Sequence, residues 1–162
     1  MKLYEYQAQK ILHKYNVNVT GGEVVTGAEE AAKVYNQLGA KRCVIKAQIL
    51  AGGRGKGGGV KIVETLDEAK EYTSEIIGSR LVTVQTGKEG IEVNKVLIAE
   101  AIDIKKELYL AISIDRSTSK IIIISSTEGG TEIERLLQKH LKRFLKNKSI
   151  QYLVFKILRH VK

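Results

Sequence analysis

A glycine-rich loop between two predicted strands constrains the fold of this chain more than any other feature. Six glycines lie between Gly52 and Gly59, in the run GGRGKGGG, and the apolar runs CVIKAQIL and VKIVE flank it. Both runs have the β-branched, apolar character of strands. Glycine lets backbone N–H groups approach an anion closely, and Arg54 and Lys56 add positive charge. The sequence therefore predicts a loop that can cover a phosphate group, with a flexible surface hairpin as the simpler alternative.

Three known phosphate-binding patterns fit this loop only in part. A Walker A loop needs Ser or Thr after Gly-Lys, whereas glycine follows the lysine here. Gly53, Gly55 and Gly58 satisfy G-x-G-x-x-G, but the dinucleotide fingerprint continues into a helix and this loop continues into a strand. With Val60 the spacing also fits the glycine loop of protein kinases, yet the chain has no H-R-D segment. A kinase-like phosphotransferase is therefore a disfavoured alternative.

Lys46 lies inside the apolar run CVIKAQIL, ahead of the loop. A lysine in a buried strand is costly unless an anion pairs with it. A phosphate held between this strand and the glycine loop would be such an anion. A lysine on an edge strand that points to water is an equally good interpretation of the pattern.

Helices and strands alternate in the first part of the chain, and strands dominate after it. Apolar spacing and capping residues predict helices over 4–15, 26–39 and 65–78, with Thr65 as a cap and Glu68 at the capping-box position. A short strand interrupted by Gly21-Gly22 is predicted within 16–25. Further β-like runs are predicted at 80–86, 95–102, 107–115 and 120–126, the last two joined by the turn DRSTS. This order predicts an α/β or α+β domain.

The net charge of +9 lies entirely in the last part of the chain. Residues 1–134 hold 18 basic and 18 acidic side chains, whereas 135–162 hold nine basic side chains and no acid. A basic protein that binds nucleic acid through 135–162 is one interpretation. Against it, the body of the chain is neutral and has no RNP, zinc or helix-turn-helix signature, so we expect no specific nucleic acid partner.

Cysteine usage and the N-terminal residues indicate the compartment. Cys43 is the single cysteine and lies in an apolar run, which favours a small core residue in a reducing environment. The run MKLYEYQAQK lacks the apolar region of a signal peptide. No stretch approaches the 18 apolar residues of a membrane span. We therefore expect a cytoplasmic protein that does not bind a membrane.

Four segments together resemble the β subunit of succinate–CoA ligase (succinyl-CoA synthetase): KLYEYQAQKIL, VIKAQILAGGRGKGGGVKIV, LIAEAIDIKKELYLAISIDR and SSTEGGTEIE. The resemblance runs from Met1 to about Glu134. It implies a partial ATP-grasp fold of the α/β (α+β) class, with an N-terminal nucleotide-binding subdomain and a β-meander. The family makes succinyl-CoA from succinate, CoA and ATP or GTP, in the tricarboxylic acid cycle, by way of a phosphohistidine on the partner α subunit. A malate–CoA ligase of the same fold is an alternative.

The resemblance implies nucleotide-binding roles for eight residues: Lys46, Gly53, Arg54, Gly55, Ala99, Glu100, Ile102 and Glu107. Lys46 would contact the phosphates, which the 53–55 loop would cover. The strand around 99–102 would be a hinge whose backbone reads the base, and Glu107 would hydrogen-bond the ribose. Ala99 stands where the family usually has an acidic residue, which is tolerable if that contact is made by the backbone. No catalytic residue is assigned to this chain.

The resemblance implies that parts of the family enzyme lie beyond Glu134. These are the Mg²⁺ ligands, the second half of the nucleotide clamp and the domain that meets the α subunit. We therefore expect no metal ligand in this chain, although the full-length family uses Mg²⁺, and we expect contact with the α subunit to be largely missing. Without metal ligands, the charge on a transferring phosphoryl group is poorly stabilised. We expect no ligase activity and weak nucleotide affinity from this chain alone.

The segment 135–162, which begins RLLQKHLKRFLK, does not continue the resemblance. It could form a basic amphipathic helix. Read in a shifted frame, suitable codons for the same residues allow IAAKTPEKILKEQIDPV and then GIQNFQARK, the continuation expected of the family. We therefore expect two regions: an incomplete ATP-grasp region at 1–134, and an out-of-frame tail at 135–162 that is not native to the family fold. The frameshift would be natural or arise from sequencing, with a stop soon after Lys162.

Overall fold

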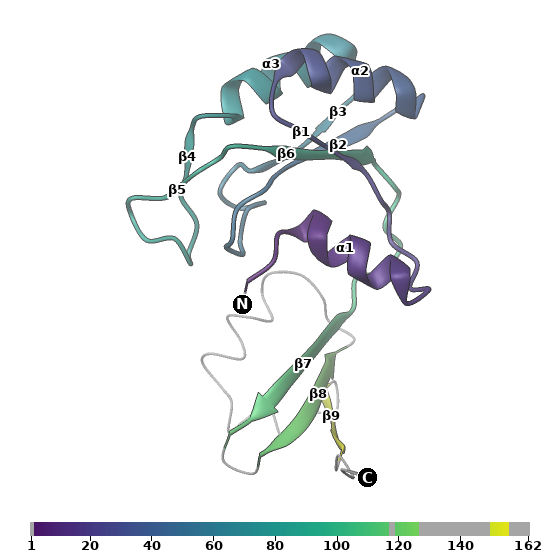
Figure 1. Ribbon diagram of the computed structural model, residues 1–162, viewed down its shortest axis with the longest axis vertical. Helices are drawn as coiled ribbons and strands as arrows, with labels where there is room; N and C mark the ends of the chain where they lie inside the picture. The colour runs from purple at the N-terminus through teal and green to yellow at the C-terminus, as the bar shows by residue number, and fades with distance from the viewer. Residues whose placement is uncertain (1, 117–118, 127–149, 156–162) are drawn as a thin grey trace. The chain divides into compact units, whose positions relative to one another are not determined.

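The computed structural model describes residues 2–116, 119–126 and 150–155 (Figure 1). The chain divides into two compact units, Met1–Ile102 and Asp103–Lys162. All the strand pairs in the described ranges are antiparallel. Helices and strands are mixed, as the predicted α/β (α+β) class requires.

The first unit is built on a four-stranded sheet with the order β1-β6-β2-β3. Its strands are β1 (Glu23–Val25), β2 (Cys43–Ala47), β3 (Val60–Val63) and β6 (Val96–Glu100). Figure 1 shows α2 (Ala28–Leu38) and α3 (Leu66–Ile76) on one face of this sheet and α1 (Glu5–Lys14) on the other. The predicted strand at 95–102 is thus inserted between β1 and β2 and does not continue into a meander with the runs after it.

Local signals explain the ends of α2 and α3. Gly39 adopts a left-handed conformation after α2, as expected for a glycine that ends a helix. The side chain of Thr65 accepts a hydrogen bond from the Glu68 backbone N–H at 3.2 Å, so the predicted cap of α3 is confirmed. The Glu68 carboxylate accepts from the backbone N–H of Glu64, one residue before the cap, so the predicted capping box is formed only in part.

The alternation of side chains along β2 separates an apolar face from a polar one. Cys43, Ile45 and Ala47 are fully buried in the core formed with α2 and α3. The prediction that Cys43 is a core residue is therefore confirmed. Lys46 pairs across the ladders with Val60 of β3 and with Leu97 of β6. Because β2 has a neighbour on each side, the interpretation of Lys46 as an edge-strand residue is wrong.

A two-stranded ribbon, β4 (Arg80–Leu81) and β5 (Ile91–Glu92), comes between α3 and β6 in the chain order. The predicted strand over 80–86 is correct only at its first two residues. The Thr83 backbone N–H donates to the Thr86 hydroxyl at 2.8 Å, and the Gln85 N–H donates to the Thr83 hydroxyl at 3.1 Å. These local bonds form a turn in place of a strand, as threonine hydroxyls can do.

The second unit contains an antiparallel meander of β7 (Tyr109–Asp115), β8 (Lys120–Ser126) and β9 (Ile150–Phe155). The predicted hairpin between 107–115 and 120–126 is confirmed. β9 comes from the segment 135–162, where a helix was one interpretation; the rest of that segment lies outside the described residues. Alternate residues of β7 leave an apolar stripe exposed: Leu110, Ile112 and Ile114 are each 69% exposed.

Truncation of Ile45 tests the assignment of the core. Ile45→Ala should lower the free energy of unfolding by about 2–5 kcal/mol, because it leaves a cavity among buried side chains. Ile62→Ala on the adjacent strand is the matched control. Since Ile62 is 54% exposed, its loss should be about 1 kcal/mol or less. Urea denaturation measures both, and equal losses would contradict this description of the core.

Candidate functional site

The glycine-rich loop joins β2 to β3 and is closed by its own backbone. The Gly59 N–H donates to the Arg54 carbonyl at 2.7 Å, and the Ala47 N–H donates to the Gly59 carbonyl at 2.7 Å. The Tyr72 hydroxyl of α3 donates to the Gly58 carbonyl at 2.6 Å. Gly53 has a φ of +77°, a conformation that favours glycine. The loop therefore joins the antiparallel strands β2 and β3 and is attached to α3 by a hydrogen bond.

The loop also packs closely against the chain at 81–83. A Cβ atom on Gly57 would lie 2.5 Å from the Val82 carbonyl oxygen, and one on Gly59 would collide with the Leu81 side chain. Close approach of backbone to backbone thus explains the glycine at 57. By contrast, a Cβ on Gly55 would meet no atom within 4 Å. Gly55 lies in the part of the loop that the resemblance assigns to phosphate contact.

Lys46 and Arg54 are brought together by one carboxylate. The Lys46 Nζ atom lies 3.0 Å from Glu5 Oε1, and the Arg54 Nη2 atom lies 2.6 Å from Glu5 Oε2. The Arg54 guanidinium also donates to the Ala47 carbonyl oxygen. The three side chains are between 19% and 23% exposed. Lys46 and Arg54, the two cations predicted to bind phosphate, therefore both contact the Glu5 carboxylate beside the glycine loop.

Electrostatics keep the Glu5 carboxylate ionised. Burial raises the pKa of this carboxyl group, but the hydrogen bond from Arg54, the charges of Lys46 and Arg54 and the hydrogen bond from Lys46 lower it more. The net pKa is below its ordinary value. The stabilisation from these ion pairs is therefore present above the ordinary pKa of a glutamate and is lost as the pH falls through the lowered one.

This arrangement pairs two cations with one anion. Lysine offers a compact point charge, and the arginine fork can donate two parallel hydrogen bonds to a carboxylate or a phosphate. Glu5, which the sequence reasoning missed, now supplies the anion. Its position in the first turn of a helix is the usual place for an acid, so the sequence contains no signal that it pairs with residues 41 and 49 positions away.

The predicted hinge residues lie on β6 and just after it. Ala99 pairs with Val44 and Leu97 pairs with Lys46, and directly opposed residues place their side chains on the same face of a sheet. Ala99 therefore shares a face with Lys46, although it is only 1% exposed. Gly22 covers it, since a Cβ on Gly22 would lie 3.0 Å from the Ala99 Cβ.

The other predicted residues are more exposed. Glu100 pairs with Cys43 at the end of β6 and is exposed, and Ile102 is 57% exposed. β1 pairs with β6 only as far as Ile98, whereas β2 pairs with it as far as Glu100. Glu107 lies in the second unit, just before β7, and is exposed.

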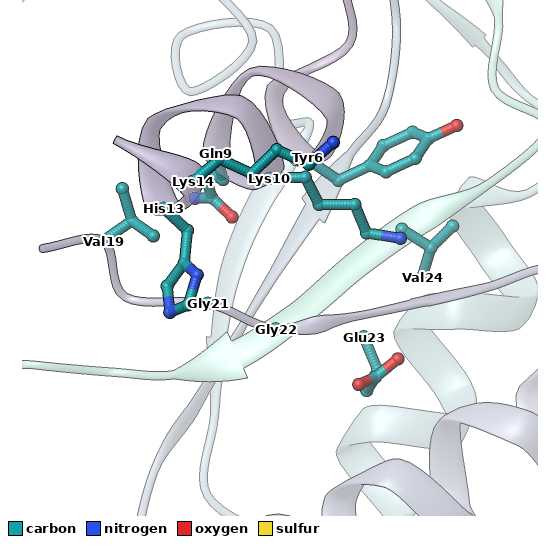
Figure 2. Close-up of a pocket in the computed structure, with 10 residues that line it drawn as sticks. All are labelled: Tyr6, Gln9, Lys10, His13, Lys14, Val19, Gly21, Gly22, Glu23 and Val24. Atoms are coloured by element: carbon teal, nitrogen blue, oxygen red, sulfur yellow. The ribbon is translucent and has the colours of Figure 1, made fainter. Parts of the chain in front are cut away.

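A cavity of about 550 Å³ lies between α1 and the chain that leads into β1. Figure 2 shows the side chains of α1, with His13 pointing toward Gly21. Lys10 and Lys14 also line it, and Glu23 is an acid in its wall. None of the eight residues predicted to bind nucleotide lines this cavity.

The part of the chain that the structure describes contains no cluster of three or more His, Cys, Asp or Glu residues that could hold a metal ion. Among the same residues, no helix is both long and apolar enough to cross a membrane.

Comparisons with known proteins relate this geometry to a family. The profile described as "ATP-grasp domain" matches residues 2–152 and so continues past Glu134. The succinate–CoA ligase [ADP-forming] subunit β of Geobacillus kaustophilus is 49% identical over 146 residues, which are 90% of this chain and 38% of that protein. The corresponding subunit of Burkholderia vietnamiensis is 49% identical over 140 residues, 86% of this chain and 36% of that protein. The chain thus spans less than two-fifths of the length of these relatives.

A solved structure shows the same fold at greater sequence distance. ATP citrate lyase from Methanothrix soehngenii, determined in complex with citrate and coenzyme A, superposes with a TM-score of 0.68. It is 22% identical in sequence and covers 98% of this chain and 35% of its own.

Substitutions in the glycine loop test its packing. Gly57→Ala should lower the free energy of unfolding by about 1–3 kcal/mol, because the new methyl group overlaps the Val82 carbonyl. Gly55→Ala is the matched control and should cost about 1 kcal/mol or less. Thermal or urea unfolding of both variants measures the difference. A loop that is free of the 81–83 segment would show the same small loss for both.

Proposed function

Because the chain belongs to the ATP-grasp domain family, we propose that it binds the phosphates of ATP, or of GTP, with Lys46 and the 53–55 loop. The observation that carries this proposal is the convergence of the Lys46 ammonium and the Arg54 guanidinium on a single carboxylate. Two cations that share one anion at the edge of a glycine-rich loop form a site that a phosphate can use. The loop at Gly55 leaves room for close approach.

We propose that the base lies along the same face of the sheet, against the backbone of 99–102. Ala99 faces the same side as Lys46 and is covered by Gly22, so a contact at this position would use main-chain atoms. β1 no longer pairs with β6 beyond Ile98. On the β1 side of β6, the backbone groups of residues 99 and 100 are therefore not paired with β1. A role for Glu107 at the ribose is part of the same proposal, supported by the family resemblance.

We propose that the reaction served by this nucleotide site is the ligation of an acid to CoA. The support is the 49% identity with ADP-forming succinate–CoA ligase β subunits. In this proposal succinate is the acid, malate is the alternative, and an α subunit supplies the phosphohistidine. The chain matches 38% of the Geobacillus subunit, so the complete reaction is assigned to the longer protein and its partner.

We assign no step of the proposed function to a metal ion held by this chain. Among the residues that the structure describes, no three or more His, Cys, Asp or Glu side chains form a group that could hold a metal ion, and the resemblance places the Mg²⁺ ligands of the family beyond Glu134. The work of Lys46 and Arg54 is to bind and orient phosphate oxygens and to offset their charge.

Removal of the Lys46 charge tests the nucleotide site. Lys46→Ala should weaken ATP binding at least about tenfold, since a charge-assisted contact with phosphate is worth about 1.5 kcal/mol or more. Isothermal titration calorimetry of the purified chain measures the dissociation constant. The control is Lys70→Ala on α3, which removes an equal charge that pairs with Glu29. Equal affinity in the wild type and in both variants would contradict the proposal.

We also propose that 135–162 is translated out of frame, after an ATP-grasp region at 1–134. The support is the abrupt change of charge and the shifted reading that restores a family-like continuation. Two observations fall inside this segment: the family profile extends to residue 152, and Ile150–Phe155 pairs with β8. The run IQYLVF is rich in β-branched and aromatic residues, which are enriched in strands.

The DNA sequence across codons 130–165 tests the shifted frame. We expect a second reading frame across these codons to encode the family continuation that should follow Glu134. An independent clone or a transcript read gives the measurement. If no other frame encodes that peptide, the proposed frameshift is wrong, and 135–162 is an authentic part of the protein.

A further inference from the structure

Polar contacts of its first turn hold helix α1 to the sheet. Glu5 pairs with Lys46 and Arg54, and the Tyr6 backbone N–H donates to Gln48 Oε1 at 3.4 Å. The Tyr4 ring, at the N-cap, lies 5.1 Å from the Lys95 ammonium.

The residues of α1 are less buried than those of α2 and α3. None of the ten residues of this helix is buried. Ile11 and Leu12, its largest aliphatic side chains, are 44% and 43% exposed. Few buried apolar contacts mark an element that opens at low free-energy cost. The ion pair of Glu5 with Arg54 therefore ties α1 directly to the glycine loop.

A bound phosphate would compete with Glu5 for the same two cations. The Glu5 carboxylate is ionised and accepts hydrogen bonds from both Lys46 and Arg54. A phosphate that reaches these donors brings further negative charge to within a few ångströms of the carboxylate. Like charges this close repel, and the repulsion is stronger in a half-buried site than in water. Because α1 is weakly anchored, the carboxylate is the anion that can leave.

We propose that Glu5 is an internal competitor of the nucleotide: it occupies the phosphate position between Lys46 and Arg54, and phosphate binding displaces it and releases the first turn of α1. This inference rests on the proposed function, since it assumes that phosphates bind at these two cations. In the free protein, Glu5 pairs with both cations, offsets part of their positive charge and holds the loop against α1. In the bound protein, the phosphate pairs with the cations and α1 is no longer tied to the loop.

The binding experiment compares three forms of the full chain by calorimetry: the wild type, Glu5→Gln and Glu29→Gln. Sodium tripolyphosphate and ATP are the ligands, and adenosine is the control without phosphate. Glu5→Gln should bind both phosphate ligands about five- to tenfold more tightly, because no ion pairs to an internal anion must be broken. Glu29→Gln removes the same charge from α2, where Glu29 pairs with Lys70 at 2.7 Å, and should match the wild type.

Hydrogen exchange of the α1 backbone amides gives a second readout that does not depend on affinity. Tripolyphosphate should accelerate exchange of these amides in the wild type. In Glu5→Gln the amides should exchange faster even without ligand, while the amides of α2 and α3 keep their protection and show that the variant is folded.

Several outcomes would overturn the inference. Equal or weaker phosphate binding by Glu5→Gln would show that Glu5 positions the cations or is irrelevant to them. Unchanged exchange in α1 on saturation would show that the helix stays docked. These results differ from a failure of the proposed function, in which the wild type binds neither ATP nor tripolyphosphate and Lys46→Ala changes nothing; in that case both proposals fall together.

Discussion

Lys46 and Arg54 carry like charges at the surface of a largely apolar sheet, and the Glu5 carboxylate between them is what makes that placement stable. Charges removed from water are costly unless they are paired. Each cation finds the same carboxylate within 3.0 Å, and Arg54 also donates to the Ala47 carbonyl. The glycine loop can therefore fold back onto β2 and α1 without leaving a positive charge unpaired at this point.

The position of β2 between β6 and β3 determines where these charges lie on the sheet. Cys43, Ile45 and Ala47 secure one face of the strand to the core, so Lys46 must project from the other face. Leu97 and Ala99 of β6 share that face through the ladder. Packing of Gly57 against Val82 sets the shape of the loop above it. The buried core, the β2–β6 ladder and the packing of the loop thus together determine the shape of this surface.

Sequence reasoning succeeded where the determining contacts are local. The Thr65 cap, the run that became β8 and the burial of Cys43 follow from neighbouring residues and from periodicity. It was wrong beyond Leu81, where threonine hydroxyls make a turn. It did not find Glu5, whose partners are 41 and 49 residues away. Such contacts depend on how elements pack, which a pattern of side chains along one element does not encode.

Competition at one pair of cations has a reciprocal consequence. If phosphate and Glu5 exclude each other, any change that strengthens the docking of α1 weakens phosphate binding, and the reverse also holds. The contacts of Tyr4 with Lys95 and of Tyr6 with Gln48 would then lower the affinity for nucleotide, although these residues do not contact the phosphate position. The free energy that docks α1 is therefore subtracted from the free energy of phosphate binding. A helix with no buried residue keeps that subtraction small enough for a ligand to overcome.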